Sequence, residues 1–71
     1  MSDLEDIARR VREERKRQGL NQERLALVAN VGVRSVHRIE HGEDTVRFDI
    51  LLRVLAALGL ELRVQRRGAR Q

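Results

Sequence analysis

The sequence contains no cysteine, no proline, no tryptophan and no tyrosine. The absence of cysteine excludes disulfide bonds and zinc sites built on thiolates. No apolar run approaches the ~18 residues that a membrane span needs, and the chain starts with polar and acidic residues where a secretory signal would be basic and then apolar. We therefore expect a cytoplasmic protein that has no membrane partner.

The chain has 71 residues, which is enough for one small domain only. A chain of this size buries only about 60% of the surface that its unfolded form exposes. Neither disulfides nor cysteine-bound metals can compensate for this small core. The sequence therefore favours stabilisation by a second subunit.

Arginine dominates the charge of the chain. The 15 basic and 11 acidic residues give a formal net charge of +4, and Lys16 is the one lysine. Guanidinium groups form paired hydrogen bonds to phosphate and to guanine. A polyanionic partner such as nucleic acid is therefore one interpretation, and an arginine-rich solvated surface is the other. Acidic residues dominate residues 1–6 and arginines dominate residues 63–71, so the C-terminus is the basic end.

A first helix is predicted over residues 3–18. Ser2 and Glu5 have the spacing of a capping box, apolar residues then recur at helical intervals, and Gly19 provides a C-terminal stop. Where this apolar stripe predicts burial, the chain carries Glu14 and Arg15, and a charge at this place needs a partner.

Two shorter helices with a tight turn between them follow. Asn21 is a favourable N-cap for a helix over residues 22–29. Asn30 tolerates the left-handed backbone conformation, so residues 30–32 are interpreted as a three-residue turn. The next helix is predicted over residues 33–41, with its last residue at 40 or 41. Two short helices joined in this way are typical of a helix-turn-helix.

The predicted helix over residues 33–41 has two unlike sides when residues are placed about 100° apart. One side carries apolar residues and an acid, and the other carries only hydrogen-bond donors. The first side consists of Val36, Ile39 and Glu40, and the second consists of Arg34, His37, Arg38 and His41. We predict that Glu40 forms a partly buried ion pair with Arg15; the alternative is that both charges are solvated.

Residues 48–58 are apolar on almost every side and predict a fourth helix that ends at Gly59. From residue 60 onward apolar and polar residues alternate, which predicts a half-buried strand over residues 60–66. A single strand cannot pair its own backbone groups. We expect it to pair antiparallel with the same strand of a second copy; the alternatives are an extension of the fourth helix and an irregular tail. The predicted dimer contacts are Leu58, Leu60, Leu62 and Val64.

The donor side of the helix over residues 33–41 suits the major groove of B-DNA. Guanine presents its O6 and N7 atoms there, and arginine is the most frequent reader of this pair. Arg34 and Arg38 are therefore candidate guanine readers, and His37 is a third candidate base reader. For each residue the alternative is an ordinary solvated polar side chain.

Candidate phosphate contacts surround this helix. Asn21, Gln22 and the N–H groups at the start of the helix over residues 22–29 form one anion site, because a helix N-terminus concentrates unpaired donors. The other candidates are Ser35, His41, Thr45 and Arg47. Together the candidate base readers and phosphate contacts predict a DNA-binding surface. Its phosphate contacts would position the protein on the duplex, and its base contacts would determine which sequence it prefers.

The segment His37-Arg38-Ile39-Glu40-His41 also has the H-x-x-E-H form of inverted zincins. We interpret this match as accidental, because the sequence offers no cysteine and no obvious third ligand, and Glu40 has a predicted partner in Arg15. The sequence shows no pattern of a nucleophilic triad, a phosphate-binding loop or a dinucleotide site. We therefore expect no enzymatic activity, no metal and no cofactor.

Residues 10–58 resemble the lambda-repressor-like, Xre-type helix-turn-helix family. The matching residues are Arg15, Gly19-Leu20-Asn21-Gln22, Leu25-Ala26, Asn30-Val31-Gly32, Val36, Arg38-Ile39-Glu40, Gly42, Leu51-Leu52, Leu55 and Leu58-Gly59. The resemblance implies that Gln22 holds a phosphate, that Arg15 and Glu40 form a buried bridge, and that the base-facing residues are Val33, Arg34, His37 and Arg38. Two departures are Asn30, where glycine is usual, and Gly32, where serine or threonine usually caps the reading helix.

The end of the chain is similar to the HipB-type antitoxins of this family, over residues 42–49 and 58–64. That resemblance implies a terminal strand paired between two protomers, a toxin partner such as a HipA-like serine/threonine kinase, and regulation of the chain's own operon. Xre-type proteins with such a strand and no toxin are the alternative. A protein-binding module that mainly neutralises a partner is a further alternative.

We therefore predict an all-α fold of four helices, with a C-terminal strand that pairs across a homodimer. Residues 1–59 form the helix-turn-helix domain, residues 60–66 the dimerising strand and residues 67–71 a flexible basic tail. The predicted function is repression of transcription on a palindromic operator in double-stranded DNA. Its half-sites are expected about one helical turn, ~34 Å, apart.

Overall fold

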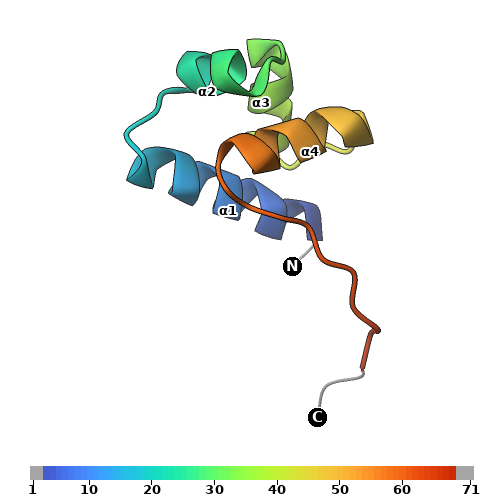
Figure 1. The fold of residues 1–71 in the computed structure, drawn as a ribbon. Coiled ribbons are helices and arrows are strands. Elements are labelled where there is room, and N and C mark those ends of the chain that lie inside the picture. The colour runs from blue at the N-terminus through green and yellow to red at the C-terminus, as the bar shows by residue number, and fades with distance from the viewer. Residues whose placement is uncertain (1–2, 69–71) are drawn as a thin grey trace.

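The computed structural model describes residues 3–68, and these residues form four α-helices and no strand. The helices are α1 (Asp3–Arg17), α2 (Gln22–Ala29), α3 (Val33–Glu40) and α4 (Phe48–Ala57). Figure 1 shows α2 and α3 lying across one side of α1 and α4, and the chain beyond α4 leaving on the other side. The predicted all-α class and the four helices are confirmed. The capping residue Ser2 and residues 69–71 of the tail lie outside the described residues.

The ends of α2 form as the sequence predicts. The side chain of Asn21 accepts a hydrogen bond from the Arg24 N–H at 2.7 Å, which caps the first turn. Asn30 adopts the left-handed conformation with φ at 59°, and the Val31 N–H then donates to the Ala26 carbonyl. This turn fixes the angle at which the chain enters α3.

The core takes one fully buried residue from each helix. Val11, Leu25, Val36 and Val54 come from α1, α2, α3 and α4 in turn, and each is 0% exposed. Smaller and flanking apolar side chains complete the cluster around them. The burial of Val36 orients α3, because it fixes the side of that helix that faces the body and leaves the other side toward solvent.

After α4, Leu58 and Leu60 still pack against the core, and the chain then leaves it. Helix α4 ends at residue 57, one residue earlier than predicted, and Leu58 follows as its cap. The side chain of Leu58 is only 3% exposed inside this chain's own core, so little of its surface remains for the predicted dimer contact. Leu60 donates its N–H to the Leu55 carbonyl at 2.8 Å and packs partly against the core.

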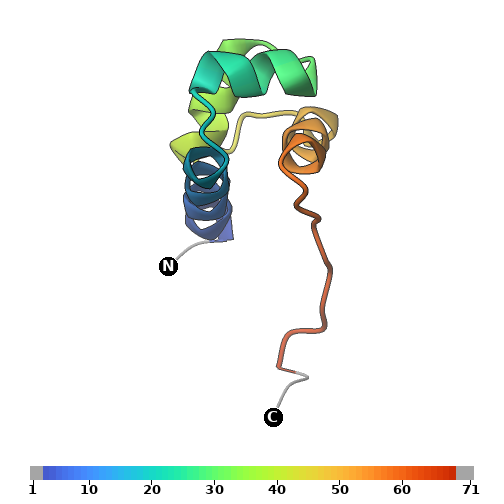
Figure 2. The same cartoon turned by 60° about the vertical axis from the view of Figure 1, so that its left-hand side comes forward.

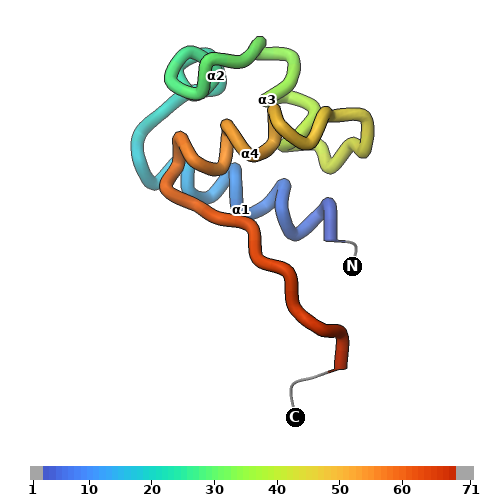
Figure 3. The backbone as a smooth tube through the Cα atoms, turned by 45° about the vertical axis from the view of Figure 1, so that its right-hand side comes forward, coloured from blue at the N-terminus to red at the C-terminus, as the bar shows by residue number. Residues whose placement is uncertain are grey.

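Residues 61–66 are extended and exposed, and they run away from the helices (Figures 2 and 3). The predicted strand over residues 60–66 therefore has no hydrogen-bonded ladder in the single chain, because within residues 3–68 its backbone makes one hydrogen bond, from the Leu60 N–H to the Leu55 carbonyl. Among the described helices, none combines the length and the apolar character that crossing a bilayer requires.

Candidate nucleic-acid interface

The exposed side of α3 carries the three charged or polar candidate base readers. Arg34 and His37 are exposed and Arg38 is half-buried, whereas Ile39 and Glu40 on the same helix are each 4% exposed. Within residues 3–68, the side chains of Arg34, His37 and Arg38 form no hydrogen bond or ion pair. Their donors are therefore available to a ligand.

The first turn of α3 is less exposed. Val33 is half-buried and packs against the core cluster, and Ser35 is half-buried as well. The α3 N-cap is Gly32, which supplies no side-chain hydrogen bond, although its carbonyl accepts from the Ser35 N–H at 3.0 Å. A base contact by Val33 would therefore use only the outer part of its side chain.

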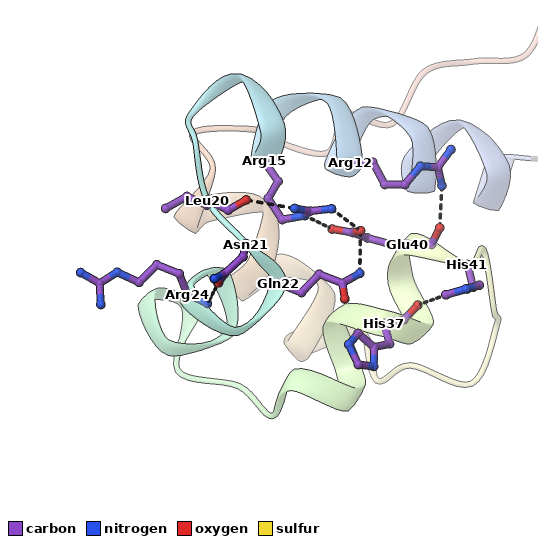
Figure 4. Close-up of polar contacts among 9 residues, drawn as sticks. All are labelled: Arg12, Arg15, Leu20, Asn21, Gln22, Arg24, His37, Glu40 and His41. Atoms are coloured by element: carbon purple, nitrogen blue, oxygen red, sulfur yellow. Dashed lines mark hydrogen bonds and ion pairs between the residues drawn. The ribbon is translucent and has the colours of Figure 1, made fainter.

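An ion pair between Arg15 and Glu40 holds α3 against α1. Arg15 Nε lies 2.6 Å from Glu40 Oε2 and Arg15 Nη2 lies 3.0 Å from Glu40 Oε1, so the two planar groups meet in a paired arrangement (Figure 4). The side chains are 11% and 2% exposed. The structure thus contains the buried pair that the sequence predicts between these two helices.

Two further side chains complete this cluster, and neither contact was predicted. Gln22 Nε2 donates to Glu40 Oε1 at 2.9 Å, which adds α2 to the pair, and Arg12 Nη1 donates to the Glu40 carbonyl at 2.6 Å. Arg12 lies three residues before Arg15 and so on the same face of α1, a spacing that could have revealed it. Arg15 also donates from Nη1 to the Leu20 carbonyl at 2.9 Å.

Burial by itself would raise the pKa of Glu40. The hydrogen bonds from Arg15 and Gln22 lower the pKa, and so do the positive charges of Arg15 and Arg12. Together they outweigh burial and hold the pKa below its ordinary value of 4.5. Glu40 is therefore ionised at neutral pH, and its charge is neutralised inside the protein. The negative charge of Glu40 therefore does not offset the positive charges on the exposed face of α3.

The candidate phosphate contacts lie around the same face. Asn21 is exposed, and its side-chain oxygen is used by the α2 cap, so its amide N–H groups remain as donors. Gln22 uses one N–H on Glu40 and keeps the other, because a carboxamide carries two. The predicted role of Gln22 at a phosphate therefore remains chemically open to it.

The remaining phosphate candidates lie at the end of α3 and in the loop after it. Thr45 is exposed, and Arg47 forms a surface pair with Asp49 at 3.1 Å while its side chain is 80% exposed. Such a pair is weak enough to exchange for a phosphate. His41 is exposed, and its Nδ1 lies 2.7 Å from the His37 carbonyl (Figure 4), which fixes the ring along the C-terminal turn of α3.

The H-x-x-E-H segment does not assemble a metal site in the part of the chain that the structure describes. No three histidine, aspartate or glutamate side chains come together there at a spacing that could hold an ion. Figure 4 shows the Glu40 carboxylate turned toward Arg15, while the His37 ring is directed away from that pair. The glutamate of the motif thus serves the ion pair between the helices.

The two short helices α2 and α3, their tight turn and the exposed donors of α3 define a helix-turn-helix protein. A family model described as helix-turn-helix matches residues 11–65, and the chain belongs to this family. The chain is also similar to a curated protein of Sinorhizobium fredii (strain NBRC 101917 / NGR234) named "Uncharacterized HTH-type transcriptional regulator y4mF". The two are 39% identical over 66 residues, which cover 93% of this chain and 87% of that protein.

Proposed function

We propose that this protein is a sequence-specific DNA-binding repressor of transcription that works as a homodimer on a palindromic operator. One observation carries the proposal: α3 is anchored by its buried side, while the donors of Arg34, His37 and Arg38 have no partner within residues 3–68. The name of the Sinorhizobium relative, a transcriptional regulator, supports the same class. The proposal assigns the chain no catalytic activity, cofactor or metal.

In the proposed complex, α3 lies in the major groove. Arg34 and Arg38 each donate two hydrogen bonds to O6 and N7 of guanine, and His37 contacts a neighbouring base. The phosphates on either side are held by the N-terminus of α2 and by the loop after α3. The residues assigned to phosphates are Asn21, Gln22, Ser35, His41, Thr45 and Arg47.

The proposal is tested by titrating the protein with the DNA upstream of its own gene at several salt concentrations. We expect the logarithm of the affinity to fall linearly with the logarithm of salt, with a slope of about −0.9 for each phosphate contact. A scrambled duplex of equal length is the control and should bind more weakly at every salt concentration. Equal and nearly salt-independent binding to both duplexes would contradict a DNA-binding repressor and favour a protein-binding module.

The homodimer part of the proposal rests on residues 60–66. Their apolar and polar residues alternate as in a strand. Leu60 still packs against the core, and residues 61–66 are extended and exposed (Figure 2). Pairing with the same segment of a second copy would satisfy backbone groups of this segment. A dimer that reads two half-sites on one side of DNA needs its two copies of α3 about one helical turn, ~34 Å, apart.

Leu62→Arg is expected to convert the dimer into a monomer, because it places a charge on the apolar side of the paired strands. Gln65→Arg is the matched control, since residue 65 has the opposite parity along the strand and the substitution adds the same side chain on the polar side. Sedimentation velocity at equal protein concentrations separates the two results. A Leu62→Arg variant that still sediments as the wild type does would contradict strand pairing.

We further propose that the partner protein is a toxin of the HipA-like serine/threonine kinase class. This part rests on the resemblance of residues 42–49 and 58–64 to HipB-type antitoxins. Co-expression of the chain with a kinase encoded beside it should relieve the growth arrest that the kinase alone causes, and the two should purify as a complex. Unrelieved growth arrest, together with intact operator binding, would instead favour a regulator that has no toxin partner.

A further inference from the structure

The extended segment after α4 already has the two faces of a strand. Glu61 and Arg63 are two residues apart and form an ion pair at 3.0 Å, with side chains 72% and 75% exposed, so both lie on one outward face. Leu60 and Leu62 lie on the other face, where they line a shallow groove together with Ile7 of α1 and Leu55 of α4. The charged residues Asp6, Arg10 and Glu61 also line this groove. The apolar face thus starts on this chain's own body.

Val64 continues the apolar face beyond the reach of that body. It is 96% exposed, whereas Leu62 is 39% exposed. Residues 61–64 also form no backbone hydrogen bond with any other part of residues 3–68. Figure 3 shows the chain beyond α4 running away from the helices toward its C-terminal end. The segment therefore exposes to solvent both the apolar side chain of Val64 and the unpaired backbone of residues 61–64.

Two identical strands that pair antiparallel about a two-fold axis place one residue opposite its own copy, and that residue fixes every other pair. If the axis passes through residue 61, Glu61 faces Glu61 of the second copy. If it passes through residue 63, Arg63 faces Arg63. Both arrangements oppose like charges directly, which destabilises a strand pair.

An axis through residue 62 satisfies both faces at once. Leu62 then faces Leu62, and each Leu60 faces the otherwise exposed Val64 of the second copy. On the outward face each Glu61 lies opposite Arg63 of the other copy, so the ion pair that is now within one chain is also available between chains. No neighbouring register gives complementary pairs on both faces.

We propose that two copies of this chain pair antiparallel over residues 60–64 with Leu62 on the two-fold axis. The inference rests on the proposed homodimer and specifies its register. Val64 of each copy then covers Leu60 at the edge of the other copy's groove, and Glu61 and Arg63 form two ion pairs across the strands. The occupant of this apolar edge is thus a second copy, selected by charge complementarity.

Single cysteines test the register cleanly, because the native sequence contains none. Residues directly opposite each other have Cβ atoms about 4.5–5.5 Å apart, close to disulfide geometry, whereas diagonal neighbours lie about 7–8 Å apart. Under mild oxidation we expect Leu62→Cys to form a covalent dimer at least several-fold faster than Glu61→Cys or Arg63→Cys. A mixture of the latter two variants should give mainly the mixed disulfide. Fastest self-linkage at residue 61 or 63 would overturn the proposed register.

Charge exchange gives a second measurement that needs no cysteine. Glu61→Arg and Arg63→Glu should each weaken the dimer about tenfold or more, and the double variant should restore it, because only the Leu62 register opposes these two residues. Equal dimer affinity in all four proteins would overturn the register. Sedimentation of the wild-type chain distinguishes the two failures: a dimer without these effects refutes the register alone, whereas a monomer refutes the homodimer as well.

Discussion

Replacing Glu40 with alanine is expected to lower the free energy of unfolding by about 3–5 kcal/mol, because it leaves the Arg15 guanidinium buried without its counter-charge. Arg15 is 11% exposed and would keep only the Leu20 carbonyl as an acceptor. The Gln22 and Arg15 donors that now converge on one carboxylate would lose it together. The loss therefore reaches three helices at once, and α3 loses its polar anchor.

Urea denaturation followed by circular dichroism measures this loss, at one protein concentration because dimerisation is linked to folding. Arg17→Ala is the matched control. Arg17 pairs with Glu14 on the surface of α1 and its side chain is 71% exposed, so its removal should cost less than about 1 kcal/mol. A Glu40→Ala variant that is as stable as the control would show that the buried pair contributes nothing net to folding.

The Glu40 carboxylate also makes the stability of the folded protein depend on pH. The pKa of Glu40 is lower in the folded protein than its ordinary value of 4.5, so its contribution is complete above that value and is lost as the pH falls through the lower, folded pKa. Glu40→Gln removes this titration while it keeps the shape of the side chain. Below the folded pKa, the stabilities of wild type and Glu40→Gln should therefore approach each other.

Much of this fold could be predicted because its signals are local. The cap at Asn21 and the left-handed turn at Asn30 depend on the chemistry of single residues, and both form as expected. The Arg15 and Glu40 pair could be predicted because each charge interrupts an apolar stripe, which leaves one partner for the other. Four helices and their order follow from the same periodicity.

The rest depends on contacts between elements, which periodicity does not encode. Gln22 was assigned to a phosphate, and only the packing of α2 against α3 shows that it also reaches Glu40. Leu58 was predicted as a dimer contact, yet it follows α4 as its cap and is 3% exposed in this chain's own core. The strand over residues 60–66 depends on a second chain, so its ladder cannot form within one copy.

Replacing Arg34 or Arg38 with alanine is expected to abolish the preference for one base pair of each operator half-site. A paired contact between arginine and guanine contributes about 1–3 kcal/mol of discrimination, which corresponds to a loss of roughly 5-fold to 150-fold in specific affinity. Arg34 is exposed and has no partner within residues 3–68, so its removal should leave folding unchanged. Arg38 is half-buried, and the stability of its variant should be measured beside its affinity.

Arg47→Ala is the control that separates reading of bases from attraction to phosphates. Arg47 lies in the loop after α3 with its side chain 80% exposed, and its loss should weaken binding evenly for operator and scrambled DNA while it reduces the salt slope by about 1. Arg34→Ala should instead weaken the operator alone, until the two duplexes differ less than they do for the wild type. If Arg34→Ala and Arg38→Ala both bind the operator as the wild type does, then α3 is not the reading helix, even though its donors face solvent.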